Sequence, residues 1–255
     1  MHSSMSATDA TGNPPLQKLP VFVYWDQGWD KAPEVCLMCR RHITRFADGH
    51  PLHFIDKNQL PEYLPELWQD HRSLLTTEQL IPQHQADMIR LCLLAKHGGI
   101  WMDSTVLCVK PIDEWLATYR DQQFFVFPFV RDNQYACSNW FIYSSSNHPL
   151  TMDWRDDFLQ RITKNLRQQV KIDYFTMHQS FDDLVKRHPH QSRWQKMLKF
   201  PHRDCSVFSH HSPTTDDLPK LLATCPLFKL NHPNGSIQRD ILQHPTLKAL
   251  LRHMA

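Results

Sequence analysis

The sequence has little glycine and no long apolar run. Six of its 255 residues are glycine, against 18 prolines, so each glycine is a candidate for a backbone geometry that other residues fit poorly. The longest apolar clusters, LCLLA at 91–95 and FFVFPFV at 124–130, fall far short of the roughly 20 residues that a membrane-spanning helix needs. The first 19 residues lack the apolar centre of a secretory signal. We expect a cytoplasmic protein, for which peripheral attachment to the inner face of the cytoplasmic membrane stays open.

Neither charge sign dominates, and the cysteines include only one close pair. Lys and Arg total 28 and Asp and Glu total 26, without a long block of either sign, so nothing indicates a nucleic-acid-binding protein. The seven cysteines are an odd number and lie in apolar segments, which predicts reduced, buried thiols in place of a disulfide framework. Cys36 and Cys39 form one CxxC, which without a second pair is a poor zinc site.

Apolar runs and helical spacing indicate an α/β domain followed by a mostly helical region. The first predicted strand, helix and strand form a βαβ-like unit, whose strands usually run parallel. Pro61, Pro65 and Pro82 are expected to break any long element after the second strand. The predicted strands are 19–25, 52–55, 100–109, 124–130 and 139–145, and the main helices before residue 148 are 33–47 and 83–97. We predict a disordered lead-in at 1–19, an α/β domain at 20–147 and a helical region at 148–255.

The stretch KHGGIWMDSTV, residues 96–106, places one carboxylate, Asp103, in an apolar strand. Burying an ionised carboxylate without a partner is costly. Asp87 and Arg90 share a face of the preceding helix, and Gly98-Gly99 would turn the strand with Asp103 back along that helix. Taken alone, the two could also form an exposed ion pair of small effect. At the carboxyl end of a strand in an α/β sheet, Asp103 is well placed to hold a divalent cation, which would serve as its partner and bind phosphate oxygens.

Several ordered motifs carry a family resemblance. The block ADMIRLCLLAKHGGIWMDSTV resembles the D-x-x-R and G-x-D-x-D block of the glycosyltransferases with a DXD motif, specifically glycosyltransferase family 32. Within that group, the chain is similar to the bacterial capsular polysaccharide synthesis proteins over most of residues 20–232. The other similar segments are VFVYWDQGWDKAPEVCLMC, SNWFIYSSSNHP, YFTMHQSFDDLV and PLFKLNH.

The resemblance implies a GT-A fold with a Rossmann-like mixed sheet, a nucleotide-sugar donor, and Mn²⁺ or Mg²⁺. It implies that Asp87 binds hydroxyls of the donor sugar, that Arg90 contacts the sugar or the diphosphate, and that Asp103 bridges the ribose and the metal. These three are the predicted catalytic residues. The full set carried over to the donor site is Trp25, Gln27, Asp87, Arg90, Trp101 and Asp103. Core packing for Trp25 and turn formation for Gln27 are the alternatives.

The chain departs from the family's motif at one position. Where the wider family has D-x-D, this chain has Asp103-Ser104-Thr105, although the capsular subgroup carries the same D-x-T form. Threonine is a neutral and weaker ligand than aspartate. The predicted metal ligands are therefore Asp103, Thr105 and the more distant His232, with Asn231 as a further candidate. An ordinary surface loop is the alternative for the last two.

The resemblance implies a metal-dependent, retaining transferase. Its predicted partners are a nucleotide-sugar donor and a glycan or lipid-linked acceptor in capsule-type polysaccharide biosynthesis, with possible peripheral association with membrane assembly machinery and without nucleic acid. One alternative is a catalytically silent binding or scaffold member of a polysaccharide-assembly complex. The other is a sugar nucleotidyltransferase, which would normally have a glycine-rich loop after the first strand, where this chain has Gly28 alone.

Overall fold

The computed structural model describes residues 17–129, 134–210, 212–231 and 241–254. Most of the predicted lead-in and the predicted ligand His232 therefore lie outside the described residues. The strands are β1 Val21–Tyr24, β2 Leu52–Ile55, β3 Gly99–Met102, β4 Val106–Cys108, β5 Phe124–Val126, β6 Phe141–Ser144 and β7 Leu227–Lys229. The helices are α1 Glu34–Arg45, α2 Leu60–Tyr63, α3 Pro65–Thr76, α4 Pro82–His97, α5 Ile112–Arg120, α6 Pro149–Arg167, α7 Thr176–Val185, α8 His190–Lys196, α9 Val207–His210, α10 Leu218–Thr224 and α11 Pro245–His253.

The main sheet has five strands in the order β2-β1-β3-β6-β5. β1 pairs in parallel with β2 and with β3, whereas β6 is antiparallel to β3 and to β5. A smaller antiparallel sheet joins β4 to β7. The predicted α/β class with a mixed sheet is thus confirmed, in the arrangement expected of a GT-A-type domain.

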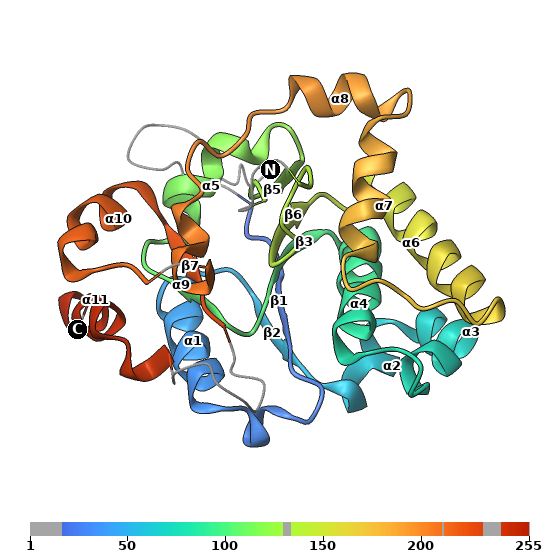
Figure 1. Cartoon of the computed structure of the whole chain (residues 1–255), viewed down its shortest axis with the longest axis horizontal. Helices are drawn as coiled ribbons and strands as arrows, with labels where there is room; N and C mark the ends of the chain where they lie inside the picture. The colour runs from blue at the N-terminus through green and yellow to red at the C-terminus, as the bar shows by residue number, and fades with distance from the viewer. Residues whose placement is uncertain (1–16, 130–133, 211, 232–240, 255) are drawn as a thin grey trace, which may run out of the picture.

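Alternating side chains of the central strands face two separate cores. Val21 and Val23 pack into the core on the α1 side, whereas Phe22 of the same strand packs into the core on the α4 side. Figure 1 shows α1, α10 and α11 on one side of the sheet and α2, α3, α4, α6 and α7 on the other. β3 alternates in the same way, so that Trp101 faces α4 while its neighbours face α1.

The link between α4 and β3 requires its two glycines. Gly98 and Gly99 have positive φ angles of 66° and 102°. A Cβ atom on Gly98 would lie 2.4 Å from the backbone nitrogen of Ser146, and one on Gly99 would lie 2.3 Å from the carbonyl oxygen of Pro20. Neither approach is possible for a residue with a side chain. The predicted tight reversal from helix to strand is confirmed.

The predicted single strand over residues 100–109 is wrong. The chain forms β3 in the main sheet and β4 in the smaller sheet, with Asp103, Ser104 and Thr105 in a turn between them. The backbone N–H of Val106 donates to the carbonyl of Asp103 at 3.0 Å, which closes this turn. High β propensity does not distinguish one long strand from two short ones that belong to different sheets.

Three other expectations need correction. Each of the three prolines lies in the first turn of a helix: Pro61 in α2, Pro65 in α3 and Pro82 in α4. They therefore start helices as well as separating them. The strand predicted at 124–130 ends at Val126, before Pro128. The C-terminal region is mostly helical as predicted, but it also contributes β7, which was not predicted.

The structure also bears on the predictions about the cysteines and about membrane-spanning helices. All seven cysteines are free and buried, as predicted. Within the described ranges, no helix has both the length and the apolarity to cross a membrane.

Candidate functional site

Asp103 lies where the central strands of the main sheet end. β1 and β3 run parallel, with Phe22 opposite Trp101, so their carboxyl ends reach the same edge. Asp103 follows β3 directly, and its backbone N–H donates to the carbonyl of Trp140 at 2.9 Å. This is the edge at which α/β sheets bind ligands.

Arg90 joins the two predicted acidic residues. Its Nη2 atom lies 3.2 Å from Oδ1 of Asp87 and 3.3 Å from Oδ1 of Asp103. Asp87 and Arg90 are buried, with 3% and 5% of their surface exposed, so the alternative of an exposed surface pair is wrong. The reversal at the glycines therefore brings Asp87, Arg90 and Asp103 together, as the sequence predicts.

Two further residues hold this arrangement in place. The guanidinium of Arg90 lies over the ring of Trp101, 5.0 Å from its centre, and Nε1 of Trp101 donates to Asp103 at 3.0 Å. The side-chain amide of Asn139 donates to Asp87 at 3.1 Å, while its backbone carbonyl accepts from Arg90 at 2.6 Å. Asp103 thus has protein partners of its own.

Lys229 completes the site, and the sequence alone did not indicate it. Lys229 ends β7 and pairs with Val106 at the start of β4. Its Nζ atom lies 3.1 Å from Oδ2 of Asp103 and donates to Oγ1 of Thr105 at 2.5 Å. The lysine lies in the segment PLFKLNH, 126 positions from Asp103 along the chain, in which Asn231 and His232 are the predicted candidates.

The two carboxylates have opposite pKa shifts. Burial raises the pKa of Asp87 to about 7 in spite of Arg90, and the charge of Asp103 adds to the increase. Burial would also raise the pKa of Asp103, but Lys229 and Arg90 outweigh it, so the pKa of Asp103 lies below its ordinary value. Near neutral pH one acid is therefore ionised and the other can gain or lose a proton. Such a separation is typical of acids with different tasks in one site.

Aromatic side chains stand beside the acids. The sulfur of Met177 at the start of α7 lies 3.4 Å from the amide of Asn139, which places this helix next to Asp87. Tyr135 and Phe175 stack with ring centres 5.2 Å apart. Tyr174 is 55% exposed, and burial of its hydroxyl together with the charges of Asp87 and Asp103 raises its pKa. The ring of Tyr174 thus offers a flat face close to the charged groups, with the ring of Phe175 next to it and the ring of Tyr135 next to that of Phe175.

The remaining predicted site residues before position 232 differ in how exposed they are and in what they contact. Trp25 follows β1 at the same edge of the sheet and is half-buried, and Gln27 lies exposed in the next turn. Trp101 is 2% exposed, so its visible contribution is support of Arg90 and Asp103. Asn231 donates its amide to the carbonyl of Ser209 at 2.9 Å. The roles of Trp25, Gln27 and Trp101 toward a nucleotide-sugar stay predictions.

The predicted Mn²⁺ or Mg²⁺ ion does not fit the described donor set while Lys229 is in place. In the described part of the chain, no three His, Cys, Asp or Glu side chains gather in a way that could hold a metal. Asp103 and Thr105 both contact the Lys229 ammonium. A divalent ion bound by these two residues would lie beside the ammonium, whose repulsion would offset part of the attraction of the ion to Asp103. Metal binding stays a prediction.

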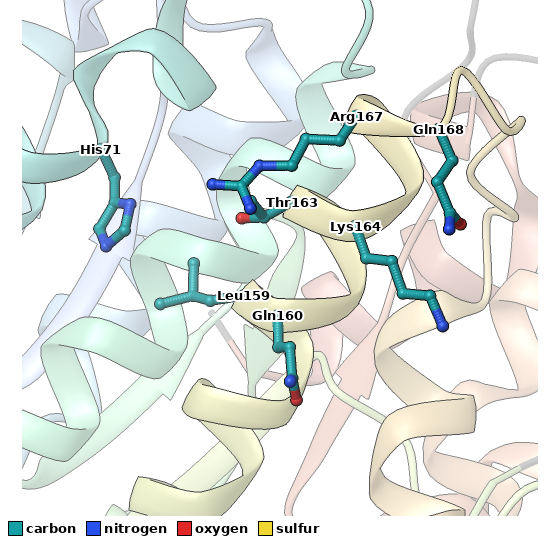
Figure 2. A pocket seen from close by; sticks show the side chains of 7 residues that line it. All are labelled: His71, Leu159, Gln160, Thr163, Lys164, Arg167 and Gln168. Atoms are coloured by element: carbon teal, nitrogen blue, oxygen red, sulfur yellow. The ribbon is translucent and has the colours of Figure 1, made fainter.

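A hollow elsewhere on the molecule is separate from this site. A cavity of about 500 Å³ lies between α3 and α6. Figure 2 shows Arg167 extending toward His71 there. None of the predicted site residues lines it. The lining residues are His71, Leu159, Gln160, Thr163, Lys164, Arg167 and Gln168.

Fold and site together define a mixed α/β protein with two acids and two cations at the carboxyl edge of its sheet. The sequence profile of the family described as capsular polysaccharide synthesis protein matches residues 2–243. The chain belongs to this family. The corresponding part of the predicted resemblance is confirmed, whereas family 32 and the DXD motif stay predictions.

Individual relatives are distant. The chain is 25% identical over 158 residues to O-glycosyltransferase PaGT of Phomopsis amygdali, across 54% of this chain and 37% of that protein. It is 27% identical over 172 residues to "Probable glycosyltransferase FCK3" of Fusarium pseudograminearum (strain CS3096), across 58% of this chain and 40% of that protein. The chain thus spans about two fifths of the length of these relatives.

One solved structure is also similar. The chain named PaToxG Glycosyltransferase aligns with 70% of this chain and 73% of its own length, at a TM-score of 0.45 and 14% identity. A likeness at this TM-score supports no conclusion about function.

Proposed function

We propose that this protein transfers a sugar from a nucleotide-sugar donor to a hydroxyl of a glycan or lipid-linked acceptor, in capsule-type polysaccharide biosynthesis. The observation that carries the proposal is the bridge that Arg90 forms between Asp87 and Asp103 at the carboxyl edge of the sheet. Membership of the capsular polysaccharide synthesis family supports the substrate class.

The charges of the site suit the departure of a nucleoside diphosphate. In the transfer, the acceptor oxygen forms a bond to the anomeric carbon, while the bond from that carbon to the diphosphate breaks and leaves its electron pair on the diphosphate. The acceptor proton passes to an oxygen of the departing diphosphate, on the same face of the sugar, and the configuration is retained. Arg90 and Lys229 are the cations that would stabilise the developing negative charge.

Asp87 and the aromatic side chains suit the sugar groups. A carboxyl group whose pKa is about 7 can accept a hydrogen bond from a sugar hydroxyl and, when protonated, can donate one. The rings of Tyr174 and Phe175 have apolar faces on which a sugar ring can lie. We therefore place the donor sugar at Asp87 and the acceptor along α7. Peripheral association with membrane assembly machinery is a further part of this proposal that needs its own test.

An assay of the full chain against a panel of nucleotide-sugars carrying uridine or guanosine diphosphate tests the proposal, in EDTA and in Mn²⁺. We expect release of nucleoside diphosphate with at least one donor, and a loss of about a hundredfold or more in Asp103→Asn. The matched control is Asp113→Asn, which changes a partly buried aspartate at the opposite edge of the sheet and should stay within about twofold of wild type.

Each rival function has its own outcome. Release of pyrophosphate from a nucleoside triphosphate and a sugar phosphate would identify a nucleotidyltransferase. Binding of donor without turnover, equal in wild type and Asp103→Asn, would identify a scaffold member. Equal release of nucleoside diphosphate by wild type and Asp103→Asn would place the reaction elsewhere and contradict the proposed site.

A further inference from the structure

We propose that Lys229 supplies the positive charge that binds the donor diphosphate beside Asp103, so that donor binding does not require a divalent metal ion. The inference rests on the proposed function and deepens it. Its starting point is geometric: the Lys229 ammonium contacts both Asp103 and Thr105, the two positions at which the predicted metal would be held.

The two cations of the site are not equally available to a ligand. Arg90 is committed to Asp87, Asp103 and the carbonyl of Asn139, and its side chain is 6% exposed. The side chain of Lys229 is 20% exposed. Its ammonium has three N–H donors, of which two serve Asp103 and Thr105, so one is left for a phosphate oxygen. Lys229 is therefore the cation that a diphosphate can contact directly, while Arg90 holds the acids and acts on the diphosphate only through its charge.

Charge balance gives the same assignment. Without Lys229, the site would hold two carboxylates and one guanidinium, and its excess negative charge would repel a diphosphate. With Lys229, the two acids face two cations, and protonation of Asp87 leaves an excess of positive charge. A metal ion is the usual means of overcoming such repulsion in acidic sites. Here the chain provides a cation of its own.

Thr105 explains why a lysine fits at this position. Its hydroxyl accepts a hydrogen bond from Lys229 without adding a negative charge. An aspartate in place of Thr105 would make a second strong ion pair with the ammonium and hold it away from a ligand. The Asp-x-Thr form and the lysine on β7 thus belong together. In the transfer, the N–H of Lys229 would donate to the diphosphate oxygen that receives the electron pair from the broken bond.

Binding of UDP and GDP to the full chain, measured by calorimetry in EDTA and in Mn²⁺, tests the inference. We expect wild type to bind one of the two in EDTA, with an affinity within about threefold of that in Mn²⁺. Lys229→Met should weaken binding in EDTA by about tenfold to a hundredfold, the usual effect of losing a charge-assisted hydrogen bond. Lys229→Arg, which keeps the charge, should restore binding to within about threefold of wild type.

Controls separate this inference from the proposed function. Lys220→Met changes an exposed lysine on α10 that pairs with Asp204 at 3.3 Å, and it should bind like wild type. Thermal unfolding of each variant shows that it is folded. Binding that requires Mn²⁺ and is the same in Lys229→Met as in wild type would overturn the inference and leave the proposed function standing. An absence of UDP and GDP binding in both buffers, together with an absence of donor turnover, would overturn both.

Discussion

Two clusters of charged side chains lie at opposite edges of the main sheet, and they differ in their composition. At the amino ends of β1 and β2, the single carboxylate of Asp113 faces three basic side chains. Lys18 lies 2.5 Å away, His50 lies 3.0 Å away and Arg120 lies 3.6 Å away. At the carboxyl edge, two carboxylates share one guanidinium. The first cluster therefore has one acid and three basic side chains, whereas the second has two acids and two cations, Arg90 and Lys229.

A shifted pKa does not by itself tell these clusters apart. Burial tends to raise the pKa of Asp113, but Lys18 and His50 lower it further, so it lies below its ordinary value, as it does for Asp103. What differs is the second acid: Asp87 has its pKa raised to about 7, and the Asp113 cluster has no counterpart to it among its described contacts. Ion pairs that only stabilise a fold also shift pKa values. The position of a cluster on the sheet, and the presence of two acids with different pKa values, therefore indicate a functional site better than one shifted pKa does.

The largest expected effect comes from removing the guanidinium that the two acids share. Arg90→Met leaves the buried Asp87 without its cation, so we expect the free energy of unfolding to fall by about 3–5 kcal/mol in urea titrations. Arg120→Met at the other edge should cost less than about 2 kcal/mol, because Asp113 keeps Lys18 and His50. Equal losses in the two variants would contradict the distinction between a shared and a redundant cation.

The same isosteric change at the two edges should separate stability from activity. Asp113→Asn removes a charge that ties together the start of β1, the start of β2 and α5, so we expect a loss of about 1–3 kcal/mol with normal donor turnover. Asp103→Asn should cost about 1 kcal/mol or less, because its side chain is 22% exposed, while turnover is lost. Thermal unfolding together with the donor assay measures both. A stability loss in Asp103→Asn that exceeds the loss in Asp113→Asn would contradict this.

How far the sequence predicts the site depends on separation along the chain. Asp87, Arg90 and Asp103 lie within 17 residues, and helical spacing plus a double glycine was enough to bring them together. Lys229 reaches them only because β7 pairs with β4. A three-residue strand shows no usable periodicity, and the turn at Asp103 that sends β4 into another sheet has no signal beyond ordinary polar residues. The contacts that depend on tertiary pairing were therefore missed.

A smaller effect is expected from the amide that supports Asp87. Asn139→Ala removes the donor to Asp87 but keeps the backbone carbonyl that accepts from Arg90, so we expect a loss of about 1–2 kcal/mol. A double-mutant cycle with Asp87→Asn should give a coupling energy of about 1 kcal/mol, and a cycle with Asp113→Asn should give almost none, because the two edges share no partner. Coupling of similar size in both cycles would show that the clusters are not independent.

The smallest effect concerns His148, a buried histidine. It differs from both clusters because the charged groups that act on it, Arg193 and His190, are basic. Burial lowers its pKa to about 4, and Arg193 and His190 add to the decrease. The unfolded chain, with an ordinary histidine pKa of about 6.5, then binds more protons than the folded chain between pH 6.5 and 4. Stability from this residue is full above pH 6.5 and is lost as the pH falls toward 4. His148→Phe keeps a ring against Phe124 and should reduce the loss of unfolding free energy between pH 7 and pH 5.5 by about 1 kcal/mol. The same change at the exposed His253 should leave that loss unaltered, and an equal reduction in both variants would rule out His148 as the cause.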